Sequence, residues 1–240
     1  MCGRYVLKRK DLEALLERLG VKDPGEYISR YNIAPSTMIP AVRATTEGAQ
    51  REAVALQWGL VPRWSKDAKS GAKLANARAE GIASKPAFRD AFKQRRCVVP
   101  ASGFYEWQTI GRLKQPWFFQ MRDESPFVFA GLWERWRSED GVELHTCALI
   151  TTSPNQVVSS FHDRMPVILR DAAVDRWLDP ATKDAAQLES LLVPVPGELM
   201  KATPVSANVN SVRNEGPELI EAATPLTSPP PSPQMSLGLE

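Results

Sequence analysis

The chain has 240 residues, of which 43% are hydrophobic, enough for one large domain or two small ones with a well-filled core. Its formal net charge is only +2, so binding to nucleic acid would require basic residues gathered on one face rather than a global excess. The sequence has no 18-residue apolar run and no signal-peptide pattern, which predicts a soluble, cytoplasmic protein with no membrane partner.

Cysteine usage points to a reducing compartment. The three cysteines, Cys2, Cys97 and Cys147, show no Cys-x-x-Cys spacing, which argues against a disulfide framework and against a zinc site. Cys97 and Cys147 lie in apolar runs and are predicted to be unreactive core residues. No metal or other cofactor is expected.

The start of the chain carries an unusual pair of nucleophiles. It opens Met1-Cys2-Gly3-Arg4-Tyr5, and cysteine is small enough that a preceding initiator methionine is normally trimmed. Trimming would leave Cys2 with a free α-amine and a thiol, groups that titrate near 8 and near 8.5. A positive neighbour such as Arg4 favours the reactive forms of both. Together they can convert an aldehyde into an imine and then a thiazolidine ring, although a frayed terminus is the simpler interpretation.

Periodicity and turn residues predict a mixture of helices and strands along the chain. Helices are expected over residues 11–19, 86–95 and 171–178, and after the capping pairs Ser153-Pro154 and Asp179-Pro180. Strands are expected at residues 54–58, 97–99, 117–121, 127–133, 145–151 and 166–169. Strands in runs with irregularly spaced helices predict an α+β fold: a β-rich core of curved, barrel-like antiparallel sheet with several short flanking helices.

The domain organisation changes near residue 222. Residues 1–221 are predicted to form a single domain. Residues 222–240 are expected to be an extended, unpacked tail, because residues 224–233 contain five prolines.

Four polar clusters interrupt the predicted elements, at residues 74–80, 103–107, 161–166 and 208–214. Asn76 offers an amide that can both donate and accept, Glu106 lies between aromatic residues, and His162 titrates near neutrality. Each also has an ordinary structural explanation: a turn for Asn76, an arginine partner for Glu106, and a core or capping role for His162.

Six short motifs follow one another in order from Cys2 to about residue 220. They are Cys2-Gly3-Arg4, Tyr31-Asn32-Ile33-Ala34-Pro35, Trp58-Gly59, Asn76-Ala77-Arg78, Gly103-Phe104-Tyr105-Glu106-Trp107 and His162-Asp163-Arg164-Met165-Pro166. Taken together, these motifs resemble the SRAP family, the SOS-response-associated peptidase-like proteins that process abasic sites in DNA. The resemblance implies a β-rich α+β fold, a groove for single-stranded DNA, and covalent capture of an abasic site by Cys2, which shields the strand from cleavage.

The resemblance also implies roles for individual residues. The expected catalytic residues are Cys2, Asn76, Glu106 and His162. Glu106 is expected to protonate the sugar oxygens and His162 to assist ring opening and reversal of the crosslink, while Asn76 orients Cys2 and the sugar. The expected DNA-binding residues are Arg4, Arg78 and Arg164 for phosphates, and Trp64 and Phe88 for stacking on bases. The protein is expected to act as a monomer in the nucleoid.

Two other functions remain open at this point. One is a peptidase of the N-terminal-nucleophile kind, in which Cys2 is the nucleophile and removal of Met1 is the minimal activity. The other is a non-catalytic protein that binds single-stranded or damaged DNA and in which Cys2 is incidental.

The end of the tail carries a candidate partner-binding motif. The last residues, Gln234-Met235-Ser236-Leu237-Gly238-Leu239-Glu240, resemble peptides with which bacterial replication and repair proteins bind the sliding clamp. In such a peptide Gln234 fixes the register, while Met235, Leu237 and Leu239 enter apolar pockets. A chance match in a frayed terminus is the alternative.

Overall fold

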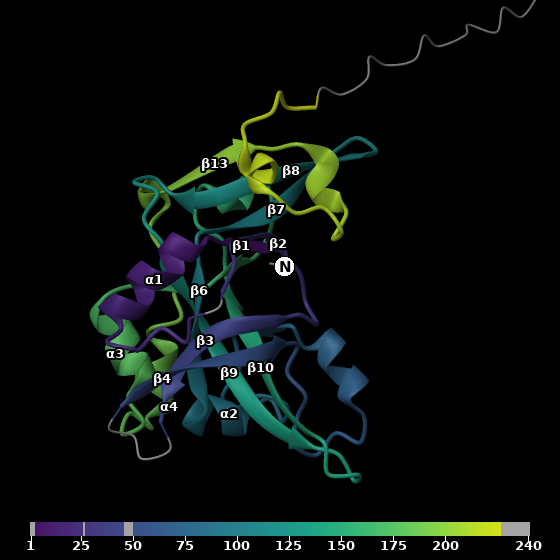
Figure 1. Cartoon of the computed structure of the whole chain (residues 1–240). Coiled ribbons are helices and arrows are strands. Elements are labelled where there is room, and N and C mark those ends of the chain that lie inside the picture. Colours follow the sequence, from purple (N-terminus) through teal and green to yellow (C-terminus); the bar gives the residue numbers. More distant parts are fainter. Residues whose placement is uncertain (1–2, 26, 46–49, 227–240) are drawn as a thin grey trace, which may run out of the picture.

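The computed structural model describes residues 3–25, 27–45 and 50–226. One sheet is antiparallel and has five strands in the order β13-β8-β7-β1-β2. Their bounds are β13 (Met200–Pro204), β8 (Leu113–Met121), β7 (Gly103–Ile110), β1 (Tyr5–Leu7) and β2 (Arg30–Ile33). Figure 1 shows this sheet above the long strands of a second one.

The second sheet closes on itself. Its closed ring consists of β3 (Met38–Ala44), β4 (Arg51–Trp58), β10 (Glu143–Thr152), β9 (Phe127–Arg137) and β6 (Arg96–Ala101), with β6 returning to β3. Three short strands attach to this barrel: β5 (Asn76–Arg78) and β11 (Met165–Pro166) to β10, and β12 (Ile168–Leu169) to β9. The predicted β-rich, barrel-like α+β fold is confirmed. One feature differs, because β10 runs parallel to β4 and to β5.

Short helices flank the barrel. They are α1 (Arg9–Arg18), α2 (Arg89–Gln94), α3 (Ala172–Leu178) and α4 (Ala185–Glu189), with α1 and α3 on one side in Figure 1. The helices expected at 11–19 and 171–178 are confirmed as α1 and α3. The helix expected from residue 86 begins only at Arg89, because residues 85–88 form a separate turn closed by a hydrogen bond from Phe88 N to Lys85 O.

The two expected capping pairs were wrong. Asn155 takes the capping role expected of Ser153, since its Oδ1 accepts from the backbone of Val157 and Val158, and only a short 3-10 turn, η2 (Val158–Ser160), follows. The Asp179 carboxylate closes a local turn with Ala181 N, so the next helix begins after Asp184. Short polar side chains readily make such turns in place of helix caps.

The core joins the barrel to the five-stranded sheet. Tyr5 of β1 packs edge-to-face on Trp58 of β4 and on Phe129 of β9, with ring centroids 5.5 and 5.8 Å apart. All three rings are buried, and each fully buried ring contributes about 1.5–3 kcal/mol relative to exposure. Cys97 and Cys147 are buried in the same core, and burial raises the pKa of the Cys97 thiol to about 12, as expected of an unreactive cysteine.

The folded domain extends past the expected boundary at residue 221. Ala222 forms a β-bridge with Val205, and Ala223 N donates to Pro204 O at 2.8 Å. Leu226 N donates to Gln115 Oε1 of β8, also at 2.8 Å. Packing therefore continues to at least Leu226, while the motif at 234–239 lies outside the described residues. Within the described ranges, no helix is long and apolar enough to cross a membrane.

Candidate active site

Strand β1 leads the N-terminal end of the chain towards Glu106. Tyr5 pairs with Phe104 of β7, and Tyr105 N donates to Arg4 O at 3.0 Å. The same antiparallel register, continued by two residues from Tyr5, sets Gly3 opposite Glu106. Cys2 itself lies outside the described residues.

Gly103 allows the strands around Glu106 to pack closely. A Cβ atom at this position would come within 2.3 Å of the Phe118 ring and 2.6 Å of Phe119 O, both on β8. Only glycine permits this approach, so the start of β7 is fixed against β8 and against β1 on its other side.

Glu106 is a buried carboxyl group with a raised pKa. Its exposed fraction is 2%, and it lies opposite Trp117 of β8. Burial removes water from the carboxylate and raises the pKa to about 7, and the nearby negative charge of Asp163 also raises it. An acid with a pKa near 7 can both donate and accept a proton near neutral pH.

An aromatic contact brings the His162 segment to the same sheet. The ring of Phe161 packs on Trp117 at 4.7 Å and on Phe119 at 5.3 Å, centroid to centroid. Because Trp117 is the cross-strand neighbour of Glu106, the residues that follow Phe161 lie close to that carboxyl group. The influence of Asp163 on the Glu106 pKa reflects the same proximity.

The hydrogen bonding of His162 favours one neutral tautomer. Burial lowers the pKa of the imidazole, and the positive charge of Lys114 lowers it further, while Asp163 opposes them. Arg164 N donates to Nδ1 of His162 at 3.0 Å, and a neutral ring that accepts this bond carries its proton on Nε2. Asp163 Oδ1 lies 2.8 Å from the same Nδ1 and can pair with it only when the ring is protonated there.

Asn76 and Arg78 lie on the barrel strand that ends beside the His162 segment. Asn76 pairs with Leu149 of β10 and Arg78 with Thr151, in parallel register. Strand β11, which follows His162, pairs with Thr151 and Thr152 at the same end of β10. Asn76 is half-buried and Arg78 is exposed. The end of β10 therefore brings together the segments of Asn76 and His162, and the aromatic contacts add Glu106.

Arg4 is held by the protein and is only partly available to DNA. Its Nη1 donates to Asn32 Oδ1 at 2.6 Å and to Val209 O at 2.9 Å, and its guanidinium lies 5.7 Å from the Trp107 ring centre. Asn32 is buried, and its Nδ2 donates to the carbonyls of Ser211 and Asn214 at 2.9 Å. These contacts fasten the N-terminal strand to the 209–214 segment.

Two of the expected DNA-binding residues are placed differently from the prediction. Nη1 and Nη2 of Arg164 donate to the carboxylate of Glu80 at 2.7 and 2.8 Å, so this face of the guanidinium is already occupied by a carboxylate. Phe88 is only 6% exposed and belongs to the main hydrophobic core, so its ring cannot stack on a base in this structure.

Trp64 presents its ring to solvent on an anchored loop. Its exposed fraction is 69%, unusual for tryptophan, and the preceding Arg63 is also largely exposed. The loop is anchored by a hydrogen bond from Trp136 Nε1 to Ser65 O at 2.7 Å and by the 3-10 turn η1 (Ala68–Lys73), capped by Asp67. An exposed ring on a fixed loop is suited to stacking on an unpaired base.

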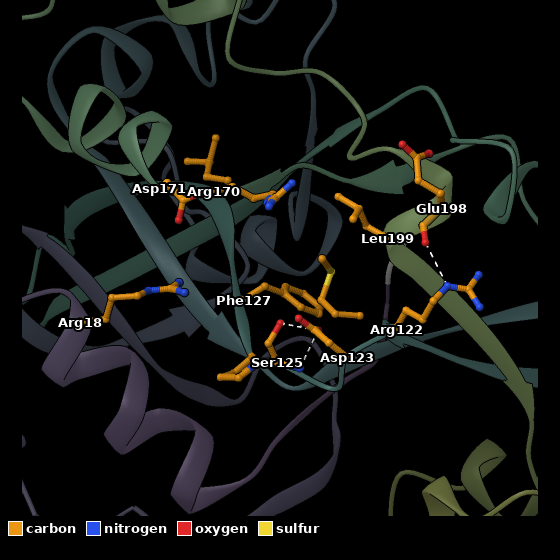
Figure 2. A pocket seen from close by; sticks show the side chains of 12 residues that line it. Arg18, Arg122, Asp123, Ser125, Phe127, Arg170, Asp171, Glu198 and Leu199 are labelled. Atoms are coloured by element: carbon orange, nitrogen blue, oxygen red, sulfur yellow. Dashed lines mark hydrogen bonds between the residues drawn. The ribbon is translucent and has the colours of Figure 1, made fainter.

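A separate cavity of about 400 Å³ contains none of the expected site residues. Figure 2 shows Arg18, Arg122 and Arg170 around it, with Phe127 among the lining residues. Arg122 Nε is engaged by Glu198 O at 3.0 Å. The lining of this cavity contains three arginines and three acidic residues, so it has no net charge that would select an ion.

Comparison with known proteins identifies the family. The family model described as "SOS response associated peptidase (SRAP)" matches residues 1–212. The chain belongs to the SRAP family. Abasic site processing protein YoqW of Bacillus subtilis is 41% identical over 226 residues, covering 92% of this chain and 100% of the relative. Abasic site processing protein HMCES of Gallus gallus is 34% identical over 226 residues, covering 82% of this chain and 67% of the relative.

Solved structures share the fold of this SRAP protein. A crystal structure of a protein from Bacteroides thetaiotaomicron superposes with a TM-score of 0.82 at 26% identity, covering 93% of this chain and 100% of that one. A second, from Bordetella bronchiseptica, has a TM-score of 0.73 at 27% identity and covers 85% and 100%. The barrel and the adjoining sheet are thus the architecture of known proteins.

Two residues of this SRAP site were missed by sequence reasoning. Asn32 fastens Arg4, and Glu80 engages Arg164. Asn32 lies inside one of the motifs and Glu80 inside a polar cluster, but their partners are 28 and 84 residues away, and only the fold shows these pairings.

Proposed function

We propose that this SRAP protein senses abasic sites in single-stranded DNA and joins them covalently through Cys2 after Met1 has been removed. The amine of Cys2 condenses with the aldehyde of the opened sugar to an imine, releasing water. The thiol then adds to the imine carbon, and its proton passes to the nitrogen, which closes a thiazolidine ring. The ring removes the imine that would otherwise promote β-elimination and strand cleavage.

The observation that carries this proposal is the placement of Glu106. It is buried, it has a pKa of about 7, and the register of β1 leads Gly3, the neighbour of Cys2, towards it. A protonated Glu106 can donate to the ring oxygen as the sugar opens and to the hydroxyl that leaves as water. His162 can exchange a proton at Nε2, and Asn76 can orient the sugar with its amide.

The DNA strand is held mainly by its phosphates and by stacking. Arg78 and Trp64 are exposed, and both suit a single strand whose bases are unpaired. The relatives are named abasic site processing proteins, which agrees with this substrate. We place the activity in the nucleoid and the protein there as a monomer.

Denaturing gels test the proposal directly. Mature protein is mixed with matched single-stranded oligonucleotides that differ only in one abasic site. A stable adduct with the abasic strand alone is expected, and a version with residues fused ahead of Cys2 should form none. An adduct formed at the normal rate by the fused version would refute the thiazolidine mechanism.

A peptidase function is the second candidate, because the family model itself is described as a peptidase. Cys2 would then act as nucleophile with its own amine as base, and removal of Met1 would be the minimal activity. Turnover of peptides by the mature protein, without adduct formation on abasic DNA, would favour this function. Binding that is lost on denaturation would instead indicate a non-catalytic DNA-binding protein.

The tail adds a proposed partner. Gln234, Met235, Leu237 and Leu239 would dock on the bacterial sliding clamp and bring the protein to replication forks. Calorimetric titration of the tail peptide against a purified clamp, beside a Gln234→Ala, Leu237→Ala peptide, tests this. Equal binding by both peptides would contradict it.

A further inference from the structure

Glu80 and Arg164 form a bidentate ion pair beside the proposed site. Arg164 Nη1 donates to Glu80 Oε1 at 2.7 Å, and Nη2 donates to Oε2 at 2.8 Å. The Glu80 side chain is 59% exposed, whereas that of Arg164 is only 12% exposed. The Arg164 hydrogen bond holds the pKa of the Glu80 carboxyl below its usual range, so the pair is ionised near neutral pH.

The pair connects two segments that attach to the same strand. Arg164 Nη2 also donates to Thr151 O of β10 at 2.6 Å, and Ala79 N donates to the same carbonyl at 2.8 Å. Glu80 follows directly after Ala79, at the end of the segment that begins with Asn76. The hydrogen bonds of the Arg164 guanidinium therefore fix the position of this residue relative to both β10 and the end of the Asn76 segment.

A fixed Arg164 side chain also holds the Arg164 backbone N–H against His162 Nδ1, and this hydrogen bond favours one tautomer of the ring. The backbone N of Arg164 donates to His162 Nδ1 at 3.0 Å, within a turn of three residues. The turn is held on its other side by His162 N, which donates to Val158 O at 3.0 Å. A shift of the Arg164 backbone would weaken the bond to Nδ1 and allow the proton to move between the two ring nitrogens.

We propose that Glu80 is a positioning residue for His162. By holding the Arg164 side chain, it keeps the Arg164 backbone N–H on Nδ1 and leaves Nε2 as the nitrogen that carries the proton. The chemical consequence rests on the proposed function, in which His162 moves a proton during opening or closing of the ring. An ion pair with so exposed a carboxylate adds little to global stability, so we assign its role to geometry.

Imidazole NMR tests the geometry without any DNA. The chain has two histidines, His145 and His162, so ¹⁵N spectra of the imidazoles contain two sets of signals, which His162→Ala assigns. At a pH where the ring is neutral, Nδ1 of His162 should show the shift of an unprotonated nitrogen. In Glu80→Gln, the Nδ1 and Nε2 shifts should move towards each other as the two tautomers mix.

A matched control separates position from charge. Glu124 is 66% exposed and pairs with Lys201 at 2.7 Å, on a loop that carries none of the proposed catalytic residues, so Glu124→Gln removes an equivalent pair. This variant should leave the His162 shifts and the adduct rate unchanged. Arg164→Lys keeps the positive charge but cannot make the bidentate pair, and it should reproduce the effect of Glu80→Gln. It also serves as the second variant if Glu80→Gln does not fold.

Adduct formation supplies the functional readout. Glu80→Gln should slow adduct formation by about 10- to 100-fold at saturating DNA, the range expected when a reacting group is misplaced. Unchanged His162 shifts in both Glu80→Gln and Arg164→Lys would overturn the inference. Tighter binding of Glu80→Gln to intact single strands, with unchanged shifts, would instead make Glu80 a competitor of phosphate for Arg164. A wild-type protein that shows the expected tautomer but forms no adduct would refute the proposed function and leave the positioning role standing.

Discussion

Each of the two sheets buries a glutamate, and the groups that surround the two carboxyls differ. Glu134 of β9, in the closed barrel, is 4% exposed, and its carboxylate accepts from Arg95 Nη2 at 2.9 Å and from Arg135 N at 3.0 Å. Glu106 of β7 is 2% exposed, and burial together with the charge of Asp163 raises its pKa to about 7. Similar burial therefore accompanies a direct arginine partner in the barrel and a raised carboxyl pKa in the open sheet. In the barrel a guanidinium contacts the carboxylate directly, whereas at Glu106 burial is the main cause of the raised pKa.

The largest expected effect is on the rate of adduct formation, when Glu106 is replaced. Glu106→Gln should slow adduct formation by about 10²–10⁴-fold, because an amide cannot exchange the proton that the sugar needs. It should not destabilise the fold, since the amide is nearly the same size and has no charge to desolvate. Quenched time courses on denaturing gels give the rate, and urea titration gives the free energy of unfolding. Wild-type rates for Glu106→Gln would remove this residue from the mechanism.

The next effect is on stability, in the barrel. Arg95→Met removes the nearer of two arginines from the buried Glu134; the other is Arg63, whose Nε is 3.9 Å from Glu134 Oε1. The free energy of unfolding should fall by about 3 kcal/mol, as for other buried pairs that lose one partner. The adduct rate of the folded protein should stay at the wild-type value. Arg89→Met, which removes an exposed pair with Asp90, is the control and should change the free energy of unfolding by less than about 1 kcal/mol.

The third prediction concerns the pH dependence of stability. The pKa of Glu106 is raised from 4.5 to about 7, so the folded state holds this proton over a range where the unfolded state has lost it. The associated stability is fully present below pH 4.5 and is lost as the pH rises through about 7, a total of about 3 kcal/mol. Urea titrations from pH 5 to pH 8 should show this decline in the wild type. If Glu106→Gln declines equally, another group is responsible.

The smallest effect is expected at Asp163. Its side chain is 82% exposed, and its charge raises the pKa of Glu106. Asp163→Asn should lower the Glu106 pKa by less than about one unit, because water and salt screen an exposed charge. The midpoint of the pH–rate profile reports the change. At high salt the wild type and the variant should converge, and a difference that persists there would point to a direct contact.

The fold was predictable where a strand is a continuous apolar run. The run at residues 127–133 predicted the centre of β9 correctly, because a strand with neighbours on both sides is buried along its length. Strand β3 was missed because Pro40 interrupts it. Pro40 is tolerated because it pairs only with Ala55 of β4, whereas β6 joins β3 further on, at Val42 and Arg43.

The candidate site was predictable only in part, for a related reason. Glu106 and His162 stand out as polar residues beside aromatic ones, and that local contrast is visible in the sequence. The roles of Asn32 and Arg164 depend on partners that the chain supplies far away, such as Ser211, which is 179 residues from Asn32. The burial of Phe88 was also not predicted, because an aromatic residue in a polar stretch gives no sign of being buried.

The bond between Arg4 and Val209 O spans 205 residues and sets an order of events during synthesis. A ribosome releases the N-terminal end of the chain first, and residues 209–214 emerge only after most of the domain has been made. The strand neighbours β2 and β7 are made earlier, but Arg4 cannot make this contact until translation is nearly complete. Throughout that interval the nascent N-terminus is open to the enzymes that remove initiator methionine, so maturation of Cys2 can precede assembly of the pocket that would use it.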